Sequence, residues 1–183
     1  MKAGLFFLQP VSIFAVLFSI FVSCNFSPDR KFLPDLIKGQ TSVLVFLSPS
    51  CPMCQNYTRT LNQLDSAYRG KGISFIAIFG PKRSDDTTEL YDFNEIYHLT
   101  LSVVRDAQNL VAHEMKATVT PEAFLVSSRG EILYQGSIDN WLIEPGQKRT
   151  LITEHYLEDA LKAYISGQSV KVKFTPAKGC LIE

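Results

Sequence analysis

The stretch FLSPSCPMCQNY, residues 46–57, holds two cysteines with two residues between them, Cys51-Pro52-Met53-Cys54. Residues 43–47 form a fully apolar run of strand formers, which is typical of a central strand covered on both faces. Beyond the cysteines, large apolar residues follow at helical spacing: Tyr57, Leu61, Leu64 and Tyr68. The stretch therefore predicts a dithiol at the junction between a buried strand and the start of a helix.

The position of the dithiol gives its two cysteines different roles. A cysteine at the N-terminus of a helix meets unsatisfied N–H groups and the positive end of the helix dipole, which favour its thiolate, so Cys51 is the candidate nucleophile. Pro52 fits the first helical turn without loss of a hydrogen bond. Cys54, about one turn further, is the candidate resolving thiol. The alternatives are a structural disulfide or half of a zinc site, and no second pair of ligands supports zinc.

Further periodic patterns follow along the chain. They predict strands over residues 73–79, 101–105, 123–126 and 132–134, the last two joined as a hairpin. They predict a helix that ends near Tyr97 after an N-cap within residues 85–89, and helices over residues 109–115 and 154–165. This order indicates an α/β protein with a central mixed sheet and helices on both faces, and it resembles the order of elements in thioredoxin.

Thr120-Pro121 lies just before the predicted strand at 123–126. In thioredoxin-like proteins this place is held by a cis-proline that faces the CxxC motif. The resemblance implies that Pro121 is cis and that the backbone of Thr120 is free to pair with a bound peptide or thiol. The alternative is an ordinary proline at a strand edge.

Length and charge narrow the possible partners. With 183 residues, the chain is long enough for one compact domain and short for two. Lys and Arg together number 18, as do Asp and Glu, and no basic run interleaved with aromatic residues is present. We therefore expect no nucleic-acid partner. We also expect no cofactor, because the predicted chemistry needs only cysteine thiols.

The N-terminal residues predict export. A mostly apolar stretch ends in Phe21-Val22-Ser23-Cys24, which resembles a bacterial lipobox with Phe in the place usually held by Leu. The expected organisation is a lipoprotein-type signal peptide over residues 1–23, a tether over 24–39 and the folded domain over 40–183. Cys24 would be lipidated and hold the protein to a membrane of the bacterial cell envelope. A plain secretion signal or an uncleaved anchor is the alternative.

Three further segments carry a narrower resemblance: TVTPEAFLVSSRGEILYQGSIDNW (118–141), ITEHYLEDAL (152–161) and GCLIE (179–183). With the dithiol stretch, they resemble peroxiredoxin-like redoxin-domain proteins of bacteria, members of the thioredoxin superfamily that are often exported or lipid-anchored. The resemblance implies a thioredoxin-like fold and a redox-active Cys51. It favours an extracytoplasmic thiol–disulfide oxidoreductase whose partners are protein or small-molecule thiols and disulfides.

A thiol peroxidase is one alternative within this resemblance. Peroxiredoxins usually carry a proline and, four residues later, a hydroxyl residue three places before the reactive cysteine. Ser48 fits the hydroxyl position, but Leu44 stands where the proline is expected. Arg105 or Arg129 would have to polarise the peroxide, since a low thiol pKa alone is not sufficient.

A Cu(I)-binding metallochaperone is an alternative from a different class. Soft thiolates of Cys51, Cys54 and Cys180, near Met53, are suitable ligands for Cu(I). A histidine such as His113 is a further candidate. Lone histidines are more often surface residues than ligands, and His98, His113 and His155 each have this simpler interpretation.

Cys180 is the remaining cysteine if Cys24 is acylated and Cys51 pairs with Cys54. It could be a second resolving cysteine, a third copper ligand or a packed residue of the C-terminal tail. Apolar residues alternate in this tail, which predicts a strand lying on the domain: Val170, Val172 and Phe174. We expect the tail to be structural.

Two polar groups are weaker candidates for the site. Glu122 follows Pro121 and could tune the dithiol or assist proton transfer, although a solvated carboxylate at a strand edge is the simpler expectation. Asp139, Asn140 and Trp141 could line a substrate groove, but a Trp packed beneath a loop explains the cluster as well.

Overall fold

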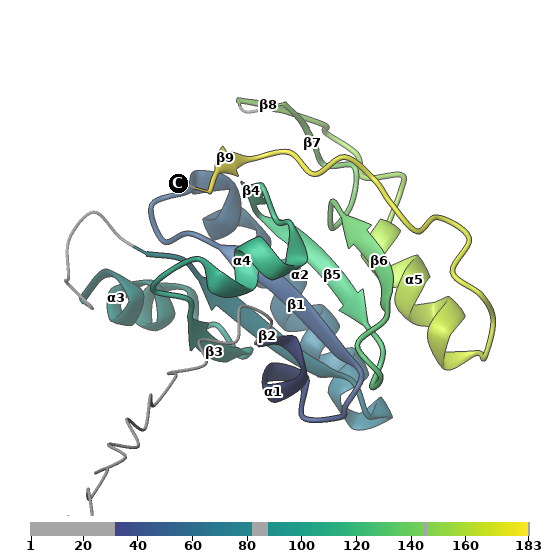
Figure 1. Ribbon diagram of the computed structural model, residues 1–183. Coiled ribbons are helices and arrows are strands. Elements are labelled where there is room, and N and C mark those ends of the chain that lie inside the picture. The colour runs from purple at the N-terminus through teal and green to yellow at the C-terminus, as the bar shows by residue number, and fades with distance from the viewer. Residues whose placement is uncertain (1–31, 82–87, 145, 183) are drawn as a thin grey trace, which may run out of the picture. The chain divides into compact units, whose positions relative to one another are not determined.

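The apolar run before the dithiol forms the central strand of a five-stranded sheet. The computed structural model describes residues 32–81, 88–144 and 146–182, and all six residues of this strand, β1 (Ser42–Leu47), are buried. The sheet order is β3-β2-β1-β5-β6 (Figure 1). Strands β1, β2 and β3 run parallel, whereas β5 is antiparallel to β1 and β6 to β5, which confirms the predicted mixed sheet. The other strands are β2 (Ser74–Phe79), β3 (Ser102–Arg105), β5 (Glu122–Val126) and β6 (Ile132–Gly136).

Helices cover both faces of the sheet because successive side chains of β1 point to opposite sides. The odd-numbered residues of β1 pack in one core with α2 (Pro52–Tyr68), α3 (Thr88–Tyr97) and α5 (Tyr156–Ile165). The even-numbered apolar residues, Leu44 and Phe46, pack in a second core with α1 (Leu33–Ile37) and α4 (Leu110–Met115). The prediction of helices on both faces is therefore confirmed.

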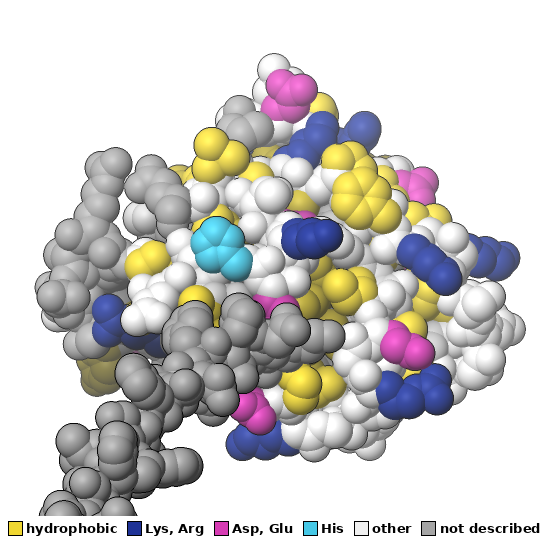
Figure 2. Space-filling view, viewed as in Figure 1, with side chains coloured by type: hydrophobic (Ala, Val, Ile, Leu, Met, Phe, Trp, Pro, Cys, Tyr) yellow, Lys and Arg dark blue, Asp and Glu magenta, His cyan; other side chains and the backbone are white. Residues whose placement is uncertain are grey.

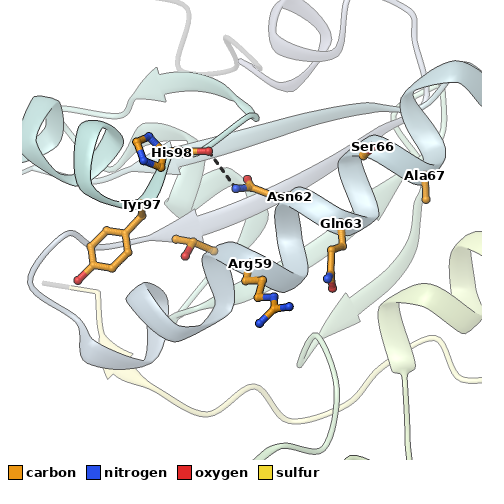
Figure 3. A pocket seen from close by; sticks show the side chains of 8 residues that line it. Arg59, Asn62, Gln63, Ser66, Ala67, Tyr97 and His98 are labelled. Carbon is orange, nitrogen blue, oxygen red and sulfur yellow. Dashed lines mark hydrogen bonds between the residues drawn. The ribbon is translucent and has the colours of Figure 1, made fainter.

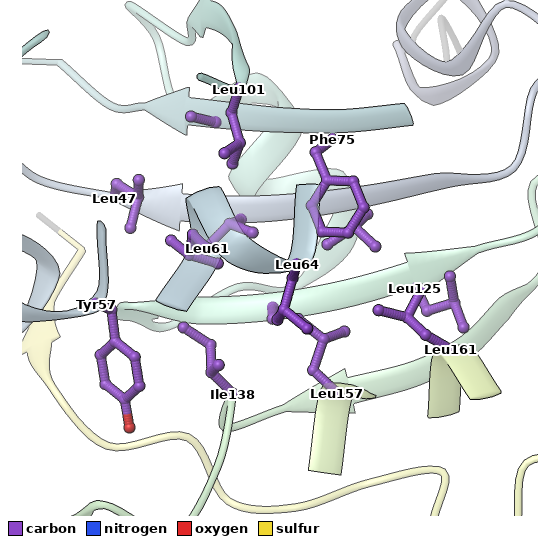
Figure 4. Packing of buried hydrophobic residues seen from close by; sticks show 14 of the residues in the cluster. Leu47, Tyr57, Leu61, Leu64, Phe75, Leu101, Leu125, Ile138, Leu157 and Leu161 are labelled. Carbon is purple, nitrogen blue, oxygen red and sulfur yellow. The ribbon is translucent and has the colours of Figure 1, made fainter. Parts of the chain in front are cut away.

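The larger core fixes α2, and with it the dithiol, against the sheet. Leu61 and Leu64 of α2 lie in one cluster with Leu157 and Leu161 of α5 (Figure 4). Beyond α2, the short 3₁₀ helix η1 (Arg69–Lys71) turns the chain into β2. Burial along one face of α2 thus holds its N-terminus at the end of β1.

The folded body includes residues that were assigned to the tether. Helix α1 lies within the predicted tether at 24–39, and its Leu33 and Ile37 are buried in the second core. The backbone N–H groups of Phe32 and Leu33 donate to the carboxylate of Glu114, at 2.6 and 3.2 Å. These contacts are distant in the sequence, so the local pattern gives no sign of them.

The C-terminal tail, residues 168–182, differs from the predicted strand. Val170 is buried, but Val172 and Phe174 are 51% and 62% exposed, and Phe174 forms only an isolated bridge with Gln135 of β6. The tail continues past β6 and ends in β9 (Cys180–Leu181), which pairs with β4 (Val119–Thr120), as the yellow end of the chain in Figure 1 shows. The tail therefore crosses the domain to the end of the sheet that carries the dithiol.

One small sheet lies near this end of the domain, formed by β7 (Leu142–Glu144) and β8 (Gln147–Lys148).

The predicted signal peptide at 1–23 and Cys24 lie outside the described residues. Within the described ranges, no helix combines the length and apolar character needed to cross a membrane.

Charged side chains of both signs are interspersed on the face seen in Figure 2. The equal numbers of basic and acidic residues in the sequence agree with this mixture. No broad area of one sign dominates the described part of this face.

Leu61→Ala tests the packing of α2. Leu61 is fully buried, and loss of a buried leucine side chain leaves a cavity, so we expect the free energy of unfolding to fall by about 3 kcal/mol. Urea denaturation measures the change. Leu151→Ala is the control, because Leu151 is 71% exposed and its removal should change stability by less than about 0.5 kcal/mol. Equal effects of the two substitutions would contradict this assignment of the core.

Candidate functional site

Cys51 is the N-cap residue of α2, as the sequence predicted for the start of a helix. Its backbone is extended, with φ −88° and ψ 113°, and Pro52 occupies the first helical turn. The carbonyl of Cys51 accepts the first helical hydrogen bond, from Gln55 at 3.2 Å, and its N–H donates to the carbonyl of Ser48 at 3.1 Å. The turn between β1 and α2 therefore fixes the Cys51 side chain at the positive end of the helix.

Cys54 lies one turn further along α2 and is completely buried. Its Sγ accepts a hydrogen bond from the backbone N–H of Ser48, at 3.4 Å. Cys51 is also buried, with 1% of its surface exposed. Both sulfurs of the CxxC motif thus lie below the surface of the described domain.

Thr120 and Pro121 lie directly beside the dithiol. The peptide bond between them is cis, in line with the interpretation drawn from the sequence, and both residues are buried. The Thr120 carbonyl lies 3.3 Å from the Cys51 Sγ and accepts a hydrogen bond from the thiol form of Cys51. The loop before β5 therefore supplies a backbone oxygen to the candidate nucleophile.

Cys180 lies in the same site. In the β4–β9 pair, Cys180 stands opposite Thr120, and its Sγ is 2.8 Å from the Cys51 Sγ. A disulfide bond measures about 2.05 Å, so the two sulfurs are in close contact without being bonded. The tail was expected to be structural, but it carries its thiol to the candidate nucleophile from 129 residues away.

The three thiols shift each other's acidity in opposite directions. Hydrogen bonding from the Cys54 thiol is the main cause that lowers the pKa of Cys51 from 9.0 to about 5; burial opposes it, and the Cys180 thiol adds to it. Burial, followed by the hydrogen bond to Cys51, raises the pKa of Cys54 well above its ordinary value. The same two causes raise the pKa of Cys180 to about 12. Near neutral pH the site therefore holds one thiolate, Cys51, flanked by two thiols.

Glu122 is not the solvated strand-edge carboxylate that we expected. It is 3% exposed, and its two oxygens accept hydrogen bonds from the backbone N–H of Thr118 and the side-chain amide of Gln135, each at 2.9 Å. The expectation was wrong because Gln135 reaches Glu122 from the neighbouring strand β6 and the backbone folds back so that the Thr118 N–H also donates to it. Glu122 holds the segment that leads into Thr120, so it is a positioning residue.

Asp139 is also buried and braces α2 near the dithiol. Its carboxylate accepts hydrogen bonds from the Tyr57 hydroxyl, at 2.6 Å, and from the backbone N–H of Trp141, at 2.8 Å. The rings of Tyr57 and Trp141 pack edge to face at 5.3 Å. Asn140 turns away to bond with Thr153. The cluster therefore supports the simpler interpretation of a packed Trp beneath a loop.

Of the candidate peroxide-site residues, Ser48 lies beside the dithiol, whereas the arginines and Leu44 do not. Arg129 follows β5, whose end at Val126 pairs with the first residue of β1, so Arg129 lies at the opposite end of the sheet and pairs with Glu131. Arg105 ends β3, two strands away from β1. The Ser48 hydroxyl bonds with that of Ser50. Leu44 faces the second core.

The histidines considered as copper ligands are all exposed at the surface. His98 lines a surface hollow beside α2, where its carbonyl accepts a hydrogen bond from the Asn62 side chain at 2.9 Å (Figure 3). His113 lies on α4, across the sheet from α2, and His155 precedes α5. Over the described ranges, no group of three or more His, Cys, Asp or Glu residues is arranged to hold a metal ion, the three thiols included.

Gly179 is a residue of the site that the sequence left without a role. A Cβ at this position would overlap the Thr120 carbonyl oxygen, so only glycine allows β9 to approach β4 this closely. The sequence signal was its place directly before Cys180, which became meaningful only with the pairing of β9.

The mixed sheet, the dithiol at the N-terminus of α2 and the adjacent cis-proline define a redoxin-domain protein of the thioredoxin superfamily. The AhpC/TSA family model matches residues 28–135, more than half of the chain, so the chain belongs to this family. It is accordingly an oxidoreductase in the broad sense. No curated protein sequence matches it.

Solved structures share the fold. A hypothetical protein from Sinorhizobium meliloti 1021 superimposes with a TM-score of 0.70 at 23% identity, covering 82% of each chain. An uncharacterised conserved protein from Geobacillus kaustophilus gives a TM-score of 0.68 at 23% identity, covering 79% of this chain and 77% of the other. These matches show that the chain shares its fold with these two proteins.

Thiolate absorbance tests the acidity of Cys51. The difference between the wild-type chain and Cys51→Ser should show a transition with a midpoint near pH 5, because two neighbouring thiols donate to the Cys51 thiolate. Cys54→Ala removes the main cause of the shift and should move the midpoint upward. Cys54→Ser, which keeps a donor, is the matched control and should move it less. A midpoint near 9 in the wild-type chain would contradict the described contacts.

Proposed function

We propose that this protein is an extracytoplasmic thiol–disulfide oxidoreductase with Cys51 as nucleophile and Cys54 as resolving thiol. The observation that carries the proposal is the position of Cys51, at the N-terminus of α2 with Cys54 one turn away and the Thr120 carbonyl at 3.3 Å. Membership of the AhpC/TSA family supports thiol redox chemistry.

The exchange follows two steps that conserve atoms and electrons. The Cys51 thiolate attacks one sulfur of a substrate disulfide, the substrate S–S bond breaks, and the leaving thiolate takes up a proton. Cys54 then loses its proton and attacks the Cys51 sulfur, which forms the Cys51–Cys54 disulfide and releases the second substrate thiol. An external reductant restores the dithiol. The same steps in reverse oxidise a substrate dithiol.

The acidities of the two cysteines fit these roles. A thiol with a lowered pKa is largely thiolate at neutral pH, as Cys51 must be to attack the substrate disulfide in the first step. Cys54 stays protonated in the resting site because it is buried beside a negative charge. Formation of the mixed disulfide neutralises Cys51 and removes that charge, so loss of the Cys54 proton becomes easier at the point where the reaction needs it.

Disulfide reduction is favoured over peroxide reduction by the surroundings of Cys51. The polar groups nearest to its sulfur are two thiols and a carbonyl, whereas Arg129 lies at the other end of the sheet and Arg105 two strands away. The carbonyl oxygen next to the sulfur can accept a hydrogen bond from a backbone N–H of a bound peptide, so it suits a peptide substrate. A peroxide oxygen needs a hydrogen-bond donor instead.

Reduction of insulin by dithiothreitol tests the nucleophile. Cys51→Ser should lower the catalysed rate to the background, since no other thiolate is present in the site. Cys54→Ser combined with Cys180→Ser leaves no neighbouring thiol to resolve the intermediate, so it should instead accumulate a mixed disulfide at Cys51, visible by mass spectrometry. Ser128→Ala, an exposed change at the far end of the sheet, should have no effect. Unchanged reduction in Cys51→Ser, or peroxide turnover faster than disulfide reduction, would overturn the proposal.

We further propose that the protein is lipid-anchored through Cys24 in the bacterial cell envelope. The lipobox-like sequence Phe21-Val22-Ser23-Cys24 supports this location. In a native bacterial host, the chain should fractionate with membranes, and its first residue should be an acylated cysteine by mass spectrometry. Cys24→Ala should remove the acyl mass and release the protein from the membrane if cleavage persists. An unmodified N-terminus in the wild-type chain would contradict the anchor.

A further inference from the structure

The tail binds the site as an added strand. β9 lies antiparallel to β4, with Cys180 opposite Thr120 and Leu181 opposite Val119, and the N–H of Ile182 donates to the carbonyl of Thr118 at 3.0 Å. Proteins often bind extended peptides in this way, with backbone hydrogen bonds for affinity and side-chain pockets for selectivity. The strand edge beside the cis-proline is therefore occupied by the chain's own C-terminus.

The residues of β9 meet the site in different ways. The Cys180 Sγ touches the Cys51 Sγ, at 2.8 Å. Gly179 has no room for a side chain, because a Cβ would overlap the Thr120 carbonyl. Leu181 is 77% exposed. This arrangement selects an extended segment in which glycine precedes the cysteine, and it sets no demand on the residue that follows.

The tail is fixed more firmly before this strand than within it. Thr175 is buried, and its hydroxyl bonds with the Tyr134 hydroxyl at 2.7 Å and with the N–H of Ser137 at 3.0 Å. Its carbonyl lies against Gly136, which leaves no space for a Cβ there. The strand itself is short and has an exposed outer side. An anchored base with a two-residue strand allows β9 to leave the site while the base of the tail stays in place.

Resting on the proposed function, we propose that Gly179–Leu181 occupies the substrate-peptide position of the site. Cys180 is then an internal substrate thiol that forms a disulfide with Cys51. External substrates are extended peptide segments in which glycine precedes the reactive cysteine. The family match ends at residue 135, so this role belongs to a part of the chain that the family model does not cover.

The internal step is a disulfide exchange without net oxidation. In the oxidised protein, the Cys180 thiolate attacks the Cys51 sulfur of the Cys51–Cys54 disulfide. The Cys51–Cys180 bond forms and the Cys51–Cys54 bond breaks. Cys54 leaves as a thiolate and takes up a proton equivalent to the one that Cys180 lost. One disulfide is present before and after the step.

The first test uses the full chain with Cys54→Ser, which leaves Cys51 and Cys180. After equilibration in a glutathione redox buffer and acid quenching, mass spectrometry of the digested protein should show a Cys51–Cys180 disulfide. Adding Gly179→Ala should lower its equilibrium constant by at least about tenfold, because the methyl group displaces β9. Adding Leu181→Ala is the control and should leave it unchanged. Glutathione on Cys51 with Cys180 as a free thiol in Cys54→Ser, or no effect of Gly179→Ala, would overturn the inference.

The second test does not depend on the folding of the Gly179→Ala chain. The peptide AKGCLI, which copies residues 177–182, and its counterpart AKACLI are each joined to glutathione by a disulfide. With dithiothreitol as electron donor, the Cys180→Ser chain should reduce the glycine peptide with a kcat/KM at least about tenfold higher than that for the alanine peptide. Equal kcat/KM values that vanish in Cys51→Ser would overturn this inference alone. Reduction that persists in Cys51→Ser would overturn the proposed function as well.

Discussion

The contact between one thiolate and two neighbouring thiols is the constraint on which the site depends. Cys51 carries the negative charge, and Cys54 and Cys180 donate to it from opposite origins, one from the same helix and one from the end of the chain. Burial alone would disfavour a thiolate, so hydrogen bonds must offset the loss of hydration. Helix α2, the segment before the cis-proline and the tail strand β9 meet here and keep the three sulfurs together.

Two buried carboxylates support this arrangement without touching the sulfurs. Asp139 holds the second turn of α2 through Tyr57, and Glu122 holds the approach to Thr120 through the N–H of Thr118. Each accepts two hydrogen bonds, one from a side chain of another element and one from a backbone N–H within four residues, as a buried carboxylate requires. The helix and the cis-proline loop are therefore fixed independently, and the spacing between their backbones sets the geometry at Cys51.

The sequence predicted those features that local patterns encode. An apolar strand followed by a dithiol and a helical repeat fixed the place of Cys51, and the resemblance to thioredoxin pointed to Pro121. Helix α1 was missed because the N–H groups at its N-terminal end are satisfied by Glu114, about eighty residues away. Glu122 was misjudged for a similar reason, since its environment depends on Gln135 across a hairpin. The tail strand was misplaced because alternating apolar residues also occur in exposed chain.

The anchor at Thr175 has a consequence for any partner that uses the site. Only four residues separate Thr175 from Cys180, and two of them are held by the domain, Pro176 by the Ser137 hydroxyl and Lys178 by the Ile143 carbonyl, so the tail presents its thiol to Cys51 over a short tether. Even a flexible linker of this length gives an effective concentration on the order of millimolar. This local concentration does not fall when the protein is diluted. A partner present at a lower concentration can therefore displace the tail only through additional binding contacts outside the two sulfurs. The tail thus sets the affinity that a partner needs in order to reach Cys51.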